Sequence, residues 1–447
     1  MVFPGVSGPY REEGGSCVRG PGEEAGVLRG GTIPRKLRAM KTLHRSLLLL
    51  LGVLLTGCGV ARVTVPPPTG EEVTILVPGY RGSFLATEGP ESERAWLTVG
   101  QALSRGERTL ALPFPGQRPV PSYGPLRPDG PMTQLSAFFV SVDAYRSFME
   151  FGREHLPGFV PFSYDWRRDI RESAGALCAR IEQLVAEGGG KRKVNIVAHS
   201  MGGLVTMHCL LHGGARAGER PWAGAGHVKR VVIIGTPFTG GPGIFDDLLV
   251  GTETLRNRAL LAPEALFTFA SAFQLLSTRS DFFVDAEGRP VELDAFDPAV
   301  WLKQGWGPFA DATLREDEAY RAQLVRMLDA HRELHEALAP RPGLEAAPFE
   351  TLVVVGTGRP TVSGMRMVDG KLDVAHPVRA DGDGAVLSAR AVPVLPVPYQ
   401  RVDSAAEHVA LMSDRGVLHA VERFLRGEHQ ETNRLTGQCS GSSVSAL

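Results

Sequence analysis

The sequence lacks several features that are typical of nucleic-acid-binding proteins and of membrane-spanning proteins. Its 447 residues have a formal net charge of −1 and no long block of like charge, so electrostatics give no reason to expect nucleic acid as a partner. No fixed-period repeat is present. The apolar run Leu47–Leu55 is too short to span a bilayer as a helix. The five cysteines do not suggest a disulfide framework, and we expect Cys178 and Cys209 to be buried free thiols.

The N-terminal part has the pattern of an export signal. Residues 1–39 show no helical or strand period and are expected to be disordered, or a wrongly assigned extension before a true start at Met40. Residues 40–57 combine a short basic region, an apolar run and small residues, as in a lipoprotein signal peptide. The Leu-Thr-Gly-Cys sequence ending at Cys58 resembles the bacterial lipobox, whose cysteine is diacylated after cleavage. The alternative is that Cys58 simply ends a plain signal peptide.

A lipidated Cys58 would anchor the protein to a membrane surface without a spanning segment. The stretch 58–70 includes three consecutive prolines and suits a stiff tether. Gly59 stands where an aspartate would act as an inner-membrane retention signal, which favours the outer membrane, on its periplasmic or surface side. We therefore expect an exported, membrane-anchored lipoprotein with a globular domain over 71–430 and a disordered tail over 431–447.

The globular part alternates strands and helices. Its strands are continuous apolar runs rather than alternating ones, which is typical of a parallel sheet covered on both faces. Two insertions interrupt this order: residues 84–157, irregular and rich in Pro and Gly, and residues 241–347, which include a convincing amphipathic helix over 316–338. Ligand sites in such sheets lie at the carboxyl ends of the strands, where these lid or cap insertions emerge. The expected strands are 73–77, 160–164, 194–197, 228–234 and 351–355, and the expected core helices are 169–187 and 201–211.

A candidate nucleophile lies between a strand and a helix. The segment Ala198-His199-Ser200-Met201-Gly202 matches the nucleophile elbow G-x-S-x-G, with alanine in the first glycine position. Small residues are needed because the turn is tight. Such a turn raises the serine Oγ at a helix N-terminus, where N–H groups favour negative charge. The alternative, a purely structural turn serine, is disfavoured by the apolar strand and helix on either side.

A nucleophilic serine requires a histidine base and an orienting acid, which follow in the chain order Ser, acid, His in the α/β-hydrolase fold. Three histidines follow the candidate acids in the chain. His419 falls within the last helix and His429 in the polar tail. The expected base is therefore His408, in the loop between the last strand-like run and the last helix. For the acid, position alone leaves Asp381 and Asp383 open, with Asp373 as a third candidate.

Several motifs together resemble the lecithin:cholesterol acyltransferase and lysosomal phospholipase/transacylase family, and span residues 73–409 in the family's order. They are Val77-Pro78-Gly79, Tyr164-Asp165-Trp166-Arg167-Arg168, the elbow Ala198 to Gly203, Gly356-Thr357-Gly358 with Pro360-Thr361, Asp381 to Val386, and Glu407-His408. The resemblance implies an α/β-hydrolase fold with helical lid insertions. Two departures stand out. The cysteine pairs that eukaryotic members carry around the lid and near the acid loop have no equivalents here, and the two insertions do not visibly match the family's lid or its membrane-binding subdomain.

The resemblance also implies roles for particular residues. The family's acid is followed by Gly-x-Val, which selects Asp383 over Asp381. One oxyanion donor would be the backbone N–H of Met201 and the other that of Tyr80, with the neighbouring Arg81 as an alternative. Asp165 and Trp166 could line the acyl site, or the segment Asp165-Trp166-Arg167 could equally be a structural ion pair beneath a packed indole.

These observations predict a serine esterase, phospholipase or acyltransferase that acts on lipid esters through Ser200, Asp383, His408 and an acyl-enzyme. It would need no metal or organic cofactor. Its partners would be a lipid ester and, through the anchor, a membrane surface. Two alternatives remain: a catalytically silent lipid- or surface-binding protein on the same fold, and an esterase or peptidase with non-lipid substrates. The acyl acceptor, the choice between hydrolysis and transfer, and the oligomeric state do not follow from the sequence.

Overall fold

The computed structural model describes residues 67–137, 140–214, 220–279 and 282–428. The expected signal peptide (40–57), the proposed anchor Cys58 and the tail (431–447) lie outside the described residues, so the expectations for them stay predictions.

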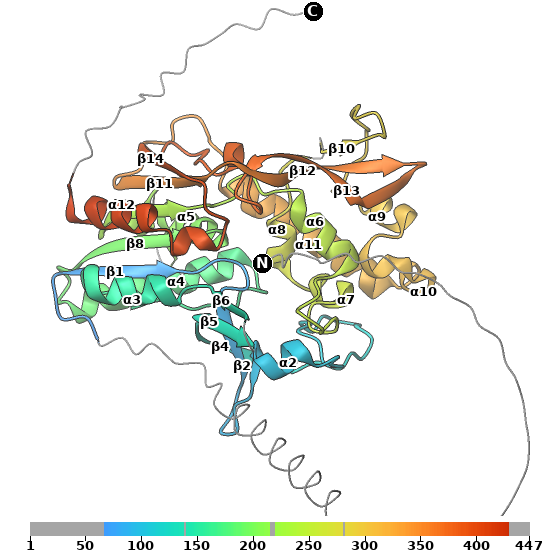
Figure 1. The fold of residues 1–447 in the computed structure, drawn as a ribbon, viewed down its shortest axis with the longest axis horizontal. Helices are drawn as coiled ribbons and strands as arrows, with labels where there is room; N and C mark the ends of the chain where they lie inside the picture. Colours follow the sequence, from blue (N-terminus) through green and yellow to red (C-terminus); the bar gives the residue numbers. More distant parts are fainter. Residues whose placement is uncertain (1–66, 138–139, 215–219, 280–281, 429–447) are drawn as a thin grey trace, which may run out of the picture. The chain divides into compact units, whose positions relative to one another are not determined.

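Six parallel strands form the central sheet, in the order β14-β11-β9-β8-β1-β7 (Figure 1). In β1, β8, β9 and β11 nearly every residue is buried, as expected for strands with both faces covered. The parallel α/β architecture predicted from the apolar runs is therefore confirmed. The strands are β1 Glu72–Val77, β7 Val160–Pro161, β8 Lys193–His199, β9 Val228–Ile234, β11 Glu350–Gly356 and β14 Tyr399–Ser404.

Helices connect and cover these strands. The core helices are α3 Arg146–His155, α4 Ile170–Glu187, α5 Met201–His212 and α12 Arg415–Arg426. Helix α4 packs against α5, and α12 packs against α3. Helix α4 begins where the Asp169 side chain accepts a hydrogen bond from the Arg171 N–H, and it ends at Gly188. Both α4 and α5 lie within one residue of their predicted bounds.

Helices α4 and α5 are also covalently joined. Cys178 and Cys209 form a disulfide, with 5.6 Å between their Cα atoms. The expectation of two free thiols was therefore wrong. The two cysteines are 31 residues apart on different helices, and their pairing depends on how these helices pack, which spacing along the chain does not reveal.

The first insertion, residues 84–157, is more regular than expected. A three-stranded antiparallel sheet in the order β3-β2-β4 and a hairpin of β5 and β6 occupy it. Its elements are β2 Ser83–Thr87, β3 Arg94–Trp96, α2 Val99–Leu103, β4 Leu126–Pro131, β5 Gln134–Ala137 and β6 Val140–Asp143. The predicted range also takes in α3, which belongs with the core helices because it packs against α12. The strands are short and contain Pro and Gly, which obscures their pattern in the sequence.

The second insertion, residues 241–347, is mainly helical as expected, with a two-residue strand as an exception. It contains α6 Gly243–Val250, α7 Pro263–Leu266, α8 Ala270–Gln274, β10 Phe283–Val284, α9 Pro298–Gln304, α10 Ala312–Arg315 and α11 Glu318–Ala337. Helix α11 packs against α8 and corresponds to the predicted amphipathic helix. Among the helices of the described ranges, none combines the length and apolar character needed to cross a membrane.

A long β-hairpin follows β11, in a part of the chain for which the sequence predicted no strand. Strands β12 Arg359–Val368 and β13 Lys371–Gly382 pair antiparallel, and β10 pairs with β12. The two strands are joined by Asp369 and Gly370, both with positive φ (50° and 74°). An Asp-Gly pair between strands is a strong hairpin signal. Register shifts around Gly364 break the alternation of β12, which explains why the hairpin was missed.

Candidate active site

The turn between β8 and α5 holds Ser200 in a strained backbone conformation, with φ 56° and ψ −129°. Only glycine fits at the second and third positions of helix α5, after Met201. A Cβ on Gly202 would lie 2.4 Å from the Val77 carbonyl oxygen, and one on Gly203 would lie 2.0 Å from Thr236 Oγ1. The helix therefore approaches the sheet closely. A backbone conformation such as that of Ser200 costs on the order of 1–3 kcal/mol, and such strain is typical of functional sites.

Ser200, His408 and Asp383 lie in one hydrogen-bonded chain. His408 Nε2 is 2.9 Å from Ser200 Oγ, and His408 Nδ1 is 2.8 Å from Asp383 Oδ2. The three residues come from the ends of different elements: the β8–α5 turn, the segment after β14, and the segment after β13. The geometry is that of a nucleophile, a base and the acid that orients the base. The structure thus brings together the three residues predicted from chain order and family resemblance.

Asp383 is buried, with 1% of its surface exposed. Its second oxygen, Oδ1, accepts hydrogen bonds from the Val386 and Ala385 N–H groups at 2.7 and 3.0 Å. Burial alone would raise the pKa of Asp383, but the facing His408 and the two N–H groups lower it below its usual value. The carboxylate is therefore held ionised, as an acid that stabilises a charged imidazole must be.

The other acid candidates have different partners. Asp381 Oδ1 accepts from the Gly358 N–H at 2.6 Å, and its Oδ2 accepts from Ser388 Oγ at 2.7 Å. Asp381 thus shapes the loop without facing the histidine. Asp373 lies on β13 beside His376, at 2.9 Å. Geometry therefore favours Asp383, the choice that position in the chain had left open.

The loop after β1 lies directly against Ser200. A Cβ on Gly79 would be 2.7 Å from Ser200 Cβ and 3.2 Å from its Oγ, so the backbone at Gly79 and Tyr80 passes beside the nucleophile. Met201 is the first residue of α5, where an N–H has no acceptor within the helix. The Met201 and Tyr80 N–H groups remain the expected oxyanion donors.

Asp165 and Trp166 have structural partners. Arg167 binds both Asp165 oxygens, at 2.9 and 2.7 Å, and donates to the Leu110 carbonyl at 2.9 Å. The indole N–H of Trp166 donates to the Ser83 carbonyl at 3.1 Å. Neither Asp165 nor Trp166 lines the cavity at Ser200. The possible acyl-site role is thus not supported, and the alternative of a structural ion pair beside a packed indole fits the contacts.

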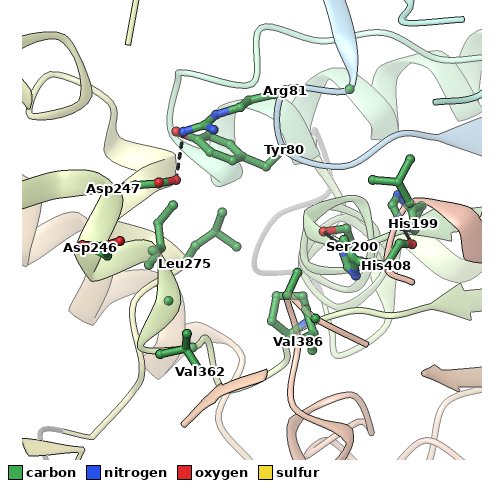
Figure 2. Close-up of a pocket in the computed structure, with 18 of the residues that line it drawn as sticks. Tyr80, Arg81, His199, Ser200, Asp246, Asp247, Leu275, Val362, Val386 and His408 are labelled. Carbon is green, nitrogen blue, oxygen red and sulfur yellow. Dashed lines mark hydrogen bonds and ion pairs between the residues drawn. The ribbon is translucent and has the colours of Figure 1, made fainter. Parts of the chain in front are cut away.

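A cavity of about 300 Å³ opens at Ser200 and His408 (Figure 2). Helix α6 and the β12–β13 hairpin line it together with the loop after β1. Its exposed lining is mostly apolar, which suits an acyl chain. The apolar side chains include those of Met132, Ile244, Leu275, Val362, Met365 and Val386.

The far side of the cavity is polar, which the sequence did not reveal. Arg81 binds Asp247 at 3.0 Å (Figure 2), and it also donates to Thr252 Oγ1 at 2.9 Å. Asp246 Oδ1 is buried without a hydrogen-bond partner among the described residues. Burial, and then the neighbouring Asp247, raises the pKa of Asp246 to about 6. No group of three or more metal-binding side chains occurs in the described parts of the chain.

Comparison with known sequences supports the resemblance. The family model described as lecithin:cholesterol acyltransferase matches residues 136–276, which include Ser200 but neither Asp383 nor His408. An uncharacterized protein of Saccharomyces cerevisiae is 24% identical over 252 residues, 56% of this chain and 36% of that protein. Lecithin-cholesterol acyltransferase-like 4 of Arabidopsis thaliana is 23% identical over 207 residues (41% and 37%). Phospholipase A(1) LCAT3 of Arabidopsis thaliana is 36% identical over 95 residues (21% and 20%).

The matched part of this chain thus spans between a fifth and somewhat over a third of the length of these relatives. Among solved structures, a chain of the Tle4–Tli4 complex aligns over 81% of this chain and 99% of its own, with 15% identity and a TM-score of 0.47. The mature Bacillus licheniformis lipase BlEst2 aligns over 81% and 95%, with 12% identity and a TM-score of 0.32. Residues 136–276 carry the sequence pattern of the lecithin:cholesterol acyltransferase family, and the resemblance expected from the motifs is therefore confirmed.

Proposed function

We propose that this protein is a serine esterase or acyltransferase that acts on lipid esters. The observation that carries the proposal is the hydrogen-bonded chain from Ser200 through His408 to Asp383, at the edge of a mostly apolar cavity. A catalytically silent binding protein would have no need to keep a strained serine 2.9 Å from a histidine that a buried carboxylate orients.

The reaction would run in two steps. Ser200 Oγ attacks the ester carbonyl carbon while its proton passes to His408 Nε2, and the tetrahedral oxygen accepts from the Met201 and Tyr80 N–H groups. When the tetrahedral intermediate collapses, His408 gives the proton to the departing alcohol. The acyl group stays bound to Ser200 Oγ as an acyl-enzyme. Water or a lipid hydroxyl then gives its proton to His408 and attacks the acyl carbon. The bond from this carbon to Ser200 Oγ breaks, His408 returns the proton to Ser200 Oγ, and a fatty acid or a new ester is released.

Whether water or a lipid hydroxyl is the acceptor depends on how well the cavity excludes water. Helix α6 and the β12–β13 hairpin both contribute to its walls, and an apolar substrate in the cavity would displace water. The full chain in mixed phospholipid and long-chain alcohol micelles should yield a fatty acid, an alkyl ester or both, identified by mass. Absence of both products with every phospholipid and neutral ester offered would contradict the lipid assignment.

The proposal places the protein outside the cytoplasm, anchored through a diacylated Cys58. The Cys178–Cys209 disulfide supports export, because stable disulfides form mainly in oxidising compartments. Expression in a bacterial host with labelled fatty acid tests the anchor. Label should enter the wild-type protein and be absent from Cys58→Ala. Equal labelling of both would refute the lipid anchor.

A further inference from the structure

A second chain of hydrogen bonds runs behind the first one. The Gly79 N–H is 2.8 Å from the Tyr145 hydroxyl oxygen, and that oxygen is 2.7 Å from His199 Nδ1. On the other side of the ring, His199 Nε2 is 3.0 Å from the carbonyl oxygen of His408. Tyr145 and His199 are both buried, with 4% and 3% of their surfaces exposed.

The chemistry of the end groups determines the direction of each bond. The His408 carbonyl can only accept, so His199 Nε2 must carry the hydrogen. His199 Nδ1 is then a lone pair in the neutral ring and accepts the Tyr145 O–H. The Tyr145 oxygen in turn accepts the Gly79 N–H. Burial, with a smaller effect from His408, lowers the pKa of His199 to about 3, which agrees with a neutral ring.

This second series of hydrogen bonds connects the two parts of the site that must be aligned with Ser200. At one end is Gly79, whose backbone touches Ser200 and precedes the expected oxyanion donor Tyr80. At the other end is the backbone of His408, the expected base. His199 itself is the residue before Ser200, and its ring lies 4.8 Å from the His408 ring, centroid to centroid. The His199 side chain thus contacts the base directly. Through Tyr145 it also contacts the loop after β1 (Pro78 to Tyr80), the oxyanion loop.

A second buried tyrosine holds the same loop. The Tyr164 hydroxyl donates to the Pro78 carbonyl at 2.6 Å. The loop residues Pro78 and Gly79 therefore each have a tyrosine hydroxyl as partner, one as donor and one as acceptor. Since a displacement of about 1 Å in a catalytic group can cost on the order of 10²-fold in rate, fixing this loop and His408 relative to Ser200 matters directly for turnover.

We propose that His199 and Tyr145 are positioning residues. They hold the oxyanion loop and the backbone of His408 in the positions relative to Ser200 that turnover requires. This inference rests on the proposed function, because it assigns these residues a role in turnover by Ser200. Both residues also line the cavity, but the proposed role requires neither of them to bind the substrate or to take part in proton transfer.

The test separates the two hydrogen bonds of His199. Gln at position 199 can place an amide N–H near Nε2 and keep the bond to His408, whereas Asn can reach Tyr145 but not His408. Leu removes both bonds, and Tyr145→Phe removes the hydroxyl while keeping the ring. Each full-length variant is assayed on a short-chain nitrophenyl ester, with kcat expressed per Ser200 titrated by a fluorophosphonate.

We expect His199→Leu to lower kcat by about 10²-fold with a smaller change in KM, because the two lost hydrogen bonds align the reacting groups, although His199 also lines the cavity. His199→Gln should recover at least about tenfold relative to His199→Leu, and more than His199→Asn does, because it keeps the contact to the base. Tyr145→Phe should lower kcat without a matching rise in KM. If His199→Leu fails to fold, Tyr145→Phe and the Gln and Asn variants still decide the question.

Matched controls come from buried residues outside the cavity. Tyr320 on α11 is 4% exposed, and His331 on α11 is 5% exposed and bonds the Phe273 carbonyl. Tyr320→Phe and His331→Gln should keep kcat per titrated site even if they lower stability. The positioning role is overturned if Tyr145→Phe and the His199 variants also keep wild-type kcat per titrated site. An inert wild type that Ser200→Ala does not change would instead refute the proposed function.

Discussion

His408 Nε2 lies 2.9 Å from Ser200 Oγ, although 208 residues of sequence separate the two. The contact exists because β8 and β14 are both parallel strands of one sheet, whose carboxyl ends lie at the same edge. The turn after β8 carries the serine, and the segment after β14 carries the histidine. The predictions below test what this arrangement implies.

The two neighbouring aspartates should differ sharply in their effect on catalysis. Asp383→Asn should lower kcat by roughly 10⁴-fold, because an amide can no longer hold the histidine in the required tautomer and stabilise its charge. Asp381→Asn should have a far smaller effect, since Asp381 bonds Gly358 and Ser388 and not His408. Steady-state kinetics on the same ester measure both. Equal losses in the two variants would contradict the assignment of the acid.

Gly79→Ala should abolish turnover while preserving the fold. The added methyl group would lie 2.7 Å from Ser200 Cβ, so either the oxyanion loop or the nucleophile must shift. Gly175→Ala is the matched control, because a Cβ at that helical position meets nothing within 4 Å. Circular dichroism and ester turnover together measure the outcome. Normal turnover by Gly79→Ala would show that the loop does not lie against Ser200 as described.

The raised pKa of Asp246 predicts that the stability of the folded protein depends on pH. Its folded-state pKa is raised to about 6, so the carboxyl binds a proton more tightly in the folded protein than in the unfolded chain. Its contribution to stability is therefore fully present below the unfolded pKa of about 3.8 and is lost as the pH rises through about 6. Asp246→Asn should raise Tm at pH 7.5 and change it little near pH 4. A Tm difference independent of pH would contradict this account.

The disulfide between α4 and α5 should contribute substantially to stability. Closing a loop of 31 residues restricts the unfolded chain, which is worth roughly 3–4 kcal/mol in the chain-entropy model. Replacing both Cys178 and Cys209 by Ala should lower the free energy of unfolding, measured with denaturant, by an amount of this order. The disulfide does not form if the variant has the same free energy of unfolding as the wild type and if Cys178 and Cys209 titrate as free thiols in the untreated wild-type protein.

Much of the fold follows from local sequence patterns. Strand β11 contains a continuous apolar run, Leu352 to Val355, and helix α4 has both a capping aspartate and a glycine stop, so their places were predicted closely. The serine was identified because the elbow requires small residues at fixed spacing. Asp383 was distinguished from Asp381 only by the family pattern, and the geometry then agreed.

Other features depend on contacts between distant segments. Tyr145 and His199 are 54 residues apart, and nothing in their local sequence indicates that they share a hydrogen bond. The partners of Arg167 include the Leu110 carbonyl, 57 residues away, so its structural role was not separable from a substrate-binding one. The β12–β13 hairpin differs in kind, since its Asp369-Gly370 turn was visible in the sequence and only its irregular strands concealed it.

The central claim is that Ser200 is an activated nucleophile, and one measurement tests it most directly. The full-length protein is treated with a fluorophosphonate probe, digested, and the modified peptide identified by mass spectrometry. We predict a single adduct on Ser200, absent from Ser200→Ala and formed far more slowly in His408→Ala. An adduct on another residue, or labelling of Ser200→Ala equal to that of the wild type, would contradict the account.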